Sequence, residues 1–123
     1  MKVHGISAGL LAMLLQLGRE HHPAEFVAIL RERDGIIDDL DLVPGTITGS
    51  SSASFFIDML PLDTHQVGSA HSHPNGVIWP SDADLNLFPK VGRYHIITGF
   101  PYTEDDWRCF SAGGDPVDLK VIG

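Results

Sequence analysis

Two histidines, a serine and an aspartate stand at a spacing that could bind a metal ion. Segment 71–74 reads His-Ser-His-Pro, and Ser81 and Asp84 follow after a short loop. Side chains two residues apart on a strand point to the same side, with Cα atoms about 6.5 Å apart. The imidazoles of His71 and His73 could therefore converge on one ion. Asp84, in the first turn of a helix that starts at Ser81, could supply a third ligand.

The donor set narrows the kind of metal site. Two imidazoles and one carboxylate with an open fourth position are typical of catalytic zinc, although iron, nickel or cobalt also suit these donors. Each half of the pattern has a simpler explanation on its own. Ser81 and Asp84 match a helix capping box, and many His-x-His pairs are incidental. Because all members of the joint pattern bear on one point, we predict a metal site formed by His71, His73 and Asp84.

Hydrolysis at such a site also needs a base that takes a proton from water and returns it to the leaving group. Glu25 is the best candidate, because it follows Pro23 at the start of the first long strand. Glu20 lies at a helix end and Glu32 at the far end of that strand. The remaining histidines show no ligand spacing and are interpreted as surface residues or hydrogen-bonded core residues: His4, His21, His22, His65 and His95.

The elements expected to position these residues are two helices and seven strands. A helix capped by Ser7 is expected over residues 8–20, and Pro23 follows its end. A second helix is expected over residues 81–88, ended by Pro89. Strands are expected over residues 26–30, 36–43, 55–57, 67–72, 94–99, 107–110 and 117–122, with turns at 34–35, 75–76 and 113–115. This order predicts an α+β domain whose mixed or antiparallel sheet has helices packed on it.

Composition limits the class of protein. The 123 residues are enough for one domain, over residues 1–123, and the net charge of −8 argues against nucleic acid and anionic membranes as partners. The apolar run 6–17 is too short to cross a bilayer and is interpreted as a buried helix rather than a signal peptide. Cys109 is the single cysteine, so no intramolecular disulfide can form. We interpret it as a buried strand residue and expect a soluble cytoplasmic protein.

The joint pattern of His71, His73, Ser81 and Asp84, preceded by Glu25, resembles the signature of the JAMM (MPN+) metalloproteases. This resemblance implies one zinc ion per chain, held by His71, His73 and Asp84. It implies Glu25 as the general acid and base that acts through a metal-activated water. It also implies that Ser81 donates a hydrogen bond to the developing oxyanion, which can coexist with a capping role through different atoms.

Segments 22–26, 58–61 and 92–97 resemble the compact single-domain archaeal members of the same family. The resemblance therefore implies a JAMM/MPN-like (cytidine-deaminase-like) fold, in which a mixed sheet is flanked by helices. Family members cleave isopeptide bonds between the C-terminal glycine of a ubiquitin-like modifier and a lysine amine. The implied partners are ubiquitin-like modifiers and their conjugates. The chain has no room for the insertions that recognise chain linkage or carry a second zinc.

Three other functions remain as alternatives. The same chemistry could trim a C-terminal extension from a ubiquitin-like sulfur-carrier protein. A non-catalytic MPN scaffold would bind protein partners, but such members lack motif residues that this chain retains. A DNA-repair relative of the RadC kind has a similar motif, and the net acidity and lack of a helix-hairpin-helix segment argue against it. Residues 45–54, rich in Gly, Ser and Thr, are either a flap over a groove that holds an extended modifier tail or an ordinary surface loop.

Overall fold

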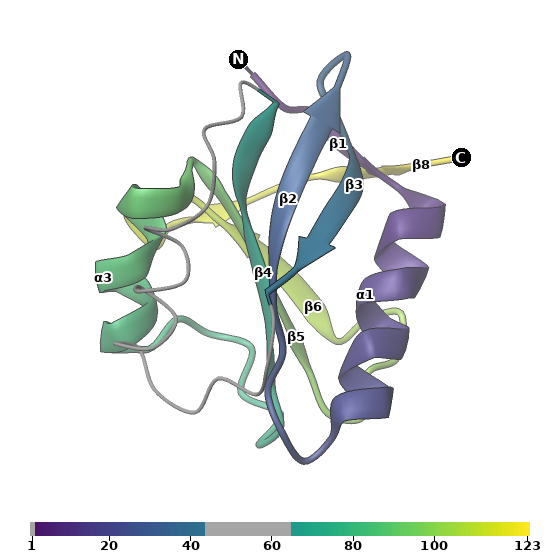
Figure 1. Ribbon diagram of the computed structural model, residues 1–123, viewed down its shortest axis with the longest axis vertical. Helices are drawn as coiled ribbons and strands as arrows, with labels where there is room; N and C mark the ends of the chain where they lie inside the picture. The colour runs from purple at the N-terminus through teal and green to yellow at the C-terminus, as the bar shows by residue number, and fades with distance from the viewer. Residues whose placement is uncertain (1, 44–64) are drawn as a thin grey trace.

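The computed structural model describes residues 2–43 and 65–123 of the chain. The helices in these residues are α1 (Ala8–His21) and α3 (Asp82–Val91). The strands are β1 (Gly5–Ser7), β2 (Val27–Arg33), β3 (Ile36–Leu42), β4 (Gln66–His73), β5 (Tyr94–Gly99), β6 (Trp107–Phe110), β7 (Pro116–Val117) and β8 (Lys120–Ile122). They form one mixed sheet in the order β7-β6-β5-β4-β2-β3-β1-β8. The expected α+β fold is confirmed, with α1 on one face of the sheet and α3 on the other (Figure 1).

Helix α1 begins as the sequence predicts. The side chain of Ser7 accepts a hydrogen bond from the amide of Leu10, 3.1 Å away, which satisfies one of the free donors at the helix start. Four leucines of this helix are buried and form the main hydrophobic core with residues such as Ala28 and Ala70: Leu10, Leu11, Leu14 and Leu15. In the described residues no helix is both long enough and apolar enough to span a membrane.

Strand β4 lies near the middle of the sheet and carries both histidines. It pairs antiparallel with β2 and parallel with β5, and α3 connects it to β5. Ala70 belongs to the core beneath α1, whereas the ring of His71 lies 6.2 Å from that of Phe88 in α3. Because side chains alternate along a strand, His71 and His73 both face α3. They stand at the carboxyl end of β4, next to the loop that leads to α3.

The second helix corrects one prediction. Helix α3 does not end before Pro89 but continues to Val91 with the proline inside it. The proline removes a single intrahelical hydrogen bond close to the helix end. Phe88 and Val91 are both buried, so packing on the sheet favours the continued helix.

The C-terminal strands correct another prediction. The strand expected over residues 117–122 is two strands on opposite edges of the sheet: β7 pairs with β6, and β8 pairs in parallel with β1. Strand β1 was not expected at all, because three residues are too few to show a period. The turn at Asp34 and Gly35 is confirmed, with φ of 55° and 82°. The loop expected over 45–54 and the strand expected over 55–57 lie outside the described residues.

Candidate metal centre

The structure brings His71, His73 and Asp84 together around one point. Nε2 of His71 lies 3.0 Å from Oδ1 of Asp84, and Nε2 of His73 lies 3.2 Å from Oδ2. The two Nε2 atoms are 3.1 Å apart. The three side chains are 8%, 12% and 14% exposed, so each of them is largely buried. One nitrogen from each ring and one carboxylate oxygen can therefore bind the same ion.

The start of α3 fixes the direction of the Asp84 carboxylate. Ser81 Oγ accepts a hydrogen bond from the amide of Asp84 at 3.1 Å, and Asp84 Oδ2 accepts one from the amide of Ser81 at 2.9 Å. This is a complete capping box. The two interpretations of this pair are thus compatible, because the cap holds the carboxylate where the imidazoles meet it.

The turn after β4 fixes the ring of His73. Its Nδ1 donates to the carbonyl oxygen of Val77 at 2.7 Å, because a carbonyl can only accept. The turn is closed by the Gly76 amide, which donates to the His73 carbonyl, and by the Val77 amide, which donates to Asn75 Oδ1. With the proton on Nδ1, the lone pair of Nε2 is free for a metal. A histidine ligand commonly uses its second nitrogen in this way.

Electrostatics favours the ionised form of Asp84, which is the form that binds a cation. Burial alone would raise the pKa of Asp84, but hydrogen bonds from His71 and His73 hold that pKa well below its usual range. Burial lowers the pKa of His73, yet the hydrogen bond to Asp84, the bond to the Val77 carbonyl and the charges of Asp84 and Glu25 raise it overall. Asp84 is therefore a carboxylate at neutral pH. Two imidazoles beside a carboxylate fit zinc.

Glu25 lies on the same face of the sheet as the two histidines. Strand β2 pairs with β4 so that Val27 is opposite His71. The pairing continues outward, since the Phe26 amide donates to Ser72 Oγ at 3.1 Å. Two residues before Val27, the antiparallel register places Glu25 opposite His73. Glu25 is half-buried, and its charge contributes to the raised pKa of His73.

Other titratable residues stand apart from this group. His95 is a core residue, as expected: its ring nitrogens are hydrogen-bonded to Ser69 Oγ and the Gly92 carbonyl, and burial lowers its pKa to about 4. Glu20 is hydrogen-bonded to Gln16 on the surface of α1. Cys109 is buried on β6, as expected, and burial raises its pKa to about 12. Among the described residues, only the group around Asp84 could hold a metal through three such ligands.

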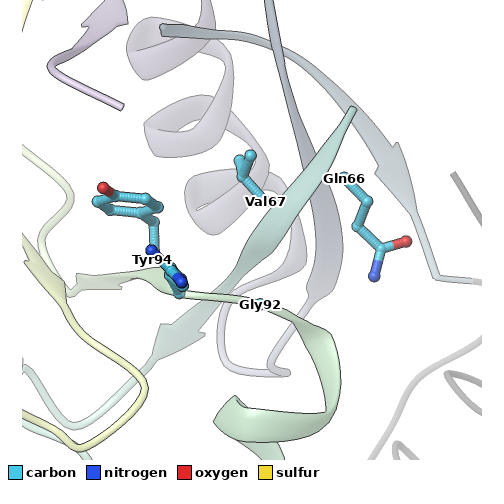
Figure 2. Close-up of a pocket in the computed structure, with 5 residues that line it drawn as sticks. Gln66, Val67, Gly92 and Tyr94 are labelled. Carbon is cyan, nitrogen blue, oxygen red and sulfur yellow. The ribbon is translucent and has the colours of Figure 1, made fainter. Parts of the chain in front are cut away.

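A cavity of about 160 Å³ lies elsewhere, at the other end of β4 (Figure 2). Gln66 and Val67 at the start of β4 line it, together with Gly92, Arg93 and Tyr94. None of these residues belongs to the metal group. The volume is below the roughly 300–1,000 Å³ typical of small-molecule sites. This cavity and the candidate metal centre thus lie at opposite ends of β4.

One functional candidate was missed from the sequence. Tyr102, between β5 and β6, is 1% exposed, and its hydroxyl lies 3.0 Å from Nδ1 of His22. Burial raises its pKa, and so does the charge of Glu25. No motif marks this tyrosine, because its partners come from distant parts of the chain.

Comparisons with known proteins agree with this geometry. The family model for prokaryotic homologs of the JAB domain matches residues 7–110. A probable metalloprotease from Haloferax volcanii is 44% identical over 131 residues, covering 98% of this chain and 81% of the relative. A JAB1/MPN domain protein from Archaeoglobus fulgidus has a similar structure, with a TM-score of 0.81 and 34% identity over 97% of this chain and 99% of that one.

A second similar structure is described as JAMM, a metalloprotease-like zinc site in the proteasome and signalosome. Its TM-score is 0.77, and it is 33% identical over 99% of this chain and 100% of that chain. The chain belongs to the JAB, or JAMM, family. It is a compact JAMM-type zinc metallopeptidase, with the JAMM/MPN fold expected from the sequence and one zinc ion as its cofactor.

Proposed function

We propose that this metallopeptidase is an isopeptidase, which cleaves the bond between the C-terminal glycine of a ubiquitin-like modifier and a lysine or peptide amine. His71, His73 and Asp84 are the proposed zinc ligands. The observation that carries the proposal is their convergence within 4.8 Å, beside a glutamate on the same face. Family membership supports the substrate class, and the single cysteine fits the cytoplasm as the compartment.

Hydrogen bonds to neighbouring backbone groups orient two of the proposed ligands. His73 is oriented through its Nδ1 bond to the Val77 carbonyl, and Asp84 through the capping box. Zinc held by these residues would polarise the scissile carbonyl and lower the pKa of a water molecule, so that hydroxide would be available as a nucleophile at neutral pH.

Glu25 is the proposed general base and acid. Its carboxylate accepts a proton from the attacking water and delivers that proton to the amine nitrogen as the C–N bond breaks. The products are the modifier's C-terminal carboxylate and a free lysine amine. The register that places Glu25 opposite His73 supports this role, because the carboxylate then faces the metal position.

Ser81 can serve the helix and the reaction at once. Its oxygen accepts the hydrogen bond from the Asp84 amide, which leaves the hydroxyl hydrogen available to donate. Ser81 is exposed, so a substrate carbonyl can reach it. We assign the hydroxyl to the oxyanion that develops on that carbonyl.

Two matched substrates test the proposal. A ubiquitin-like protein that ends in Gly-Gly is joined to a fluorescent peptide either through a lysine side chain or as a linear fusion. We expect cleavage of the isopeptide substrate, its loss with a chelator and its return with added zinc. His71→Asn should abolish zinc binding, whereas His4→Asn, on the surface, should not.

The outcome also separates the alternatives. Cleavage of the linear fusion alone would favour the processing of a carrier protein over isopeptide hydrolysis. If the zinc-loaded protein cleaved neither substrate, the proposed substrate class would be refuted. The non-catalytic scaffold has lost its support, because the chain is a metallopeptidase by family.

A further inference from the structure

We propose that Tyr102 is a positioning residue for Glu25, and that it acts by anchoring the segment 22–25 between α1 and β2. This inference rests on the proposed role of Glu25 as the proton carrier. It deepens that function by naming what holds the glutamate in place.

Tyr102 is held from several sides. Its ring occupies a notch in α1 where the chain has Gly18, since a Cβ there would lie 2.5 Å from the ring carbon Cδ1. The guanidinium of Arg19 donates to the Tyr102 carbonyl at 2.6 Å. The amide of Tyr102 donates to the Gly99 carbonyl at 2.7 Å. The tyrosine therefore connects the end of β5 to the last turns of α1.

The backbone of Tyr102 is in a conformation that bulky residues avoid. Its φ is 63°, in the left-handed region. Such a conformation persists only where the surroundings impose it, and it is common at functional sites. Here the contacts with Gly18 and Arg19 impose it, and the result is that the hydroxyl points to His22.

The hydroxyl reaches the segment that carries Glu25. It is hydrogen-bonded to Nδ1 of His22, whose ring also stacks on Phe100 with centroids 4.7 Å apart. At the other end of the segment, the Phe26 amide donates to Ser72 Oγ. Glu25 thus lies between two anchors, one provided by Tyr102 and one by Ser72. Its charge raises the pKa of both Tyr102 and His73, so the carboxylate lies near both.

The position of Glu25 matters because proton transfer requires close approach. A general base must come within about 2.6–3.2 Å of the proton it takes. A displacement of about 1 Å can cost a factor of about 100 in rate. Strand β2 begins at Val27, and its backbone pairing with β4 extends to Phe26, whose carbonyl accepts from the Ser72 amide at 3.3 Å. Glu25 precedes this pair, so its position depends on the anchors at both ends of the segment 22–26.

The first test compares two tyrosines that each lose one hydroxyl. Tyr102→Phe removes the bond to His22. Tyr94→Phe is the matched control, since it removes a bond with the Val3 amide. The Ala24 amide donates to the His21 carbonyl at 2.7 Å, inside the anchored segment. In Tyr102→Phe we expect hydrogen exchange at this amide to rise about fivefold, the equivalent of one lost hydrogen bond. We expect kcat to fall about tenfold with KM within about twofold and zinc content unchanged. Tyr94→Phe should change none of these.

A second pair of variants acts on the notch instead of the hydroxyl. Gly18→Ala should displace the Tyr102 ring and reproduce the loss of kcat. Gly9→Ala in the same helix meets nothing within 4 Å and should leave kcat unchanged. Both substitutions raise helix propensity, so propensity cannot explain a difference between them.

A double-mutant cycle with Glu25→Gln decides whether Tyr102 acts through Glu25. If it does, Tyr102→Phe should lower kcat no further in the Glu25→Gln background. A full additional loss there, or wild-type kcat in Tyr102→Phe, would overturn the inference. If the wild-type protein cleaves no conjugate, the proposed function fails by itself. The exchange rate of Ala24 still tests the anchor in that case, and a wild-type rate in Tyr102→Phe overturns it.

Discussion

Replacing Ser81 separates its two roles. As a helix cap the serine contributes an acceptor oxygen. In its proposed role as the oxyanion partner it contributes a hydroxyl hydrogen. Ser81→Thr keeps both. Ser81→Gly loses the hydroxyl, but glycine is a tolerable cap and costs only a few tenths of a kcal/mol. Ser81→Ala loses both.

The expected results therefore differ between stability and turnover. Thermal unfolding should place Gly near wild type and Ala lower by about 1 kcal/mol, or about 4 °C for a domain of this size. The value of kcat should fall by about 100-fold in both Gly and Ala and stay near wild type in Thr. The zinc content of each variant should be measured by metal analysis as a control. The same cap orients Asp84, so a variant could lose turnover because it has lost zinc. Wild-type turnover in Ser81→Gly would refute the oxyanion role. If kcat fell only in the variants that also lose stability, the two roles of Ser81 could not be separated in this way.

The remaining predictions concern the base, the metal and pH. Glu25→Gln should keep its zinc and lose turnover by about 100-fold or more, while Glu20→Gln on the surface of α1 should match wild type in the same assay. Removal of zinc with a chelator should lower the melting temperature, and titration with zinc should restore it, since ligands bind the folded state. Burial lowers the pKa of His95 to about 4, below its ordinary value of 6.5, so the contribution of this residue to stability should be full above pH 6.5 and be lost as pH falls toward 4. The expected loss in the free energy of unfolding is on the order of 3 kcal/mol, measurable by denaturant unfolding of zinc-free protein. In His95→Gln this dependence of stability on pH should be weaker.

Local signals made much of the structure predictable. The metal group comes from one continuous stretch, in which β4, a turn and α3 follow each other, so spacing alone could indicate that His71, His73 and Asp84 meet. The Ser7 cap and the Asp34-Gly35 turn depend on neighbours within a few residues. In each case the energies that decide the conformation act over a short length of chain.

Features that depend on tertiary packing were harder to predict. Pro89 indicates a helix end locally, but burial of Phe88 and Val91 carries α3 past it. The residues of β8 show no sign that they pair with β1, at the start of the chain. The ring of Tyr102 packs against Gly18, which is distant in the sequence. A single glycine in a helix does not indicate which side chain occupies the space beside it.

The three proposed zinc ligands are fixed by more regular structure than Glu25 is. The ligands extend from a central strand and from a capped helix start, so sheet pairing and the capping box fix them together. Glu25 precedes the first ladder residue of β2 and is held through the contacts of His22 and Phe26. With Glu25 in its proposed role, damage to the packing between α1 and the end of β5 should therefore reduce proton transfer before it releases zinc. A protein that retains its metal but turns over slowly is thus the expected result of mutation on that side, and metal content alone would not detect it.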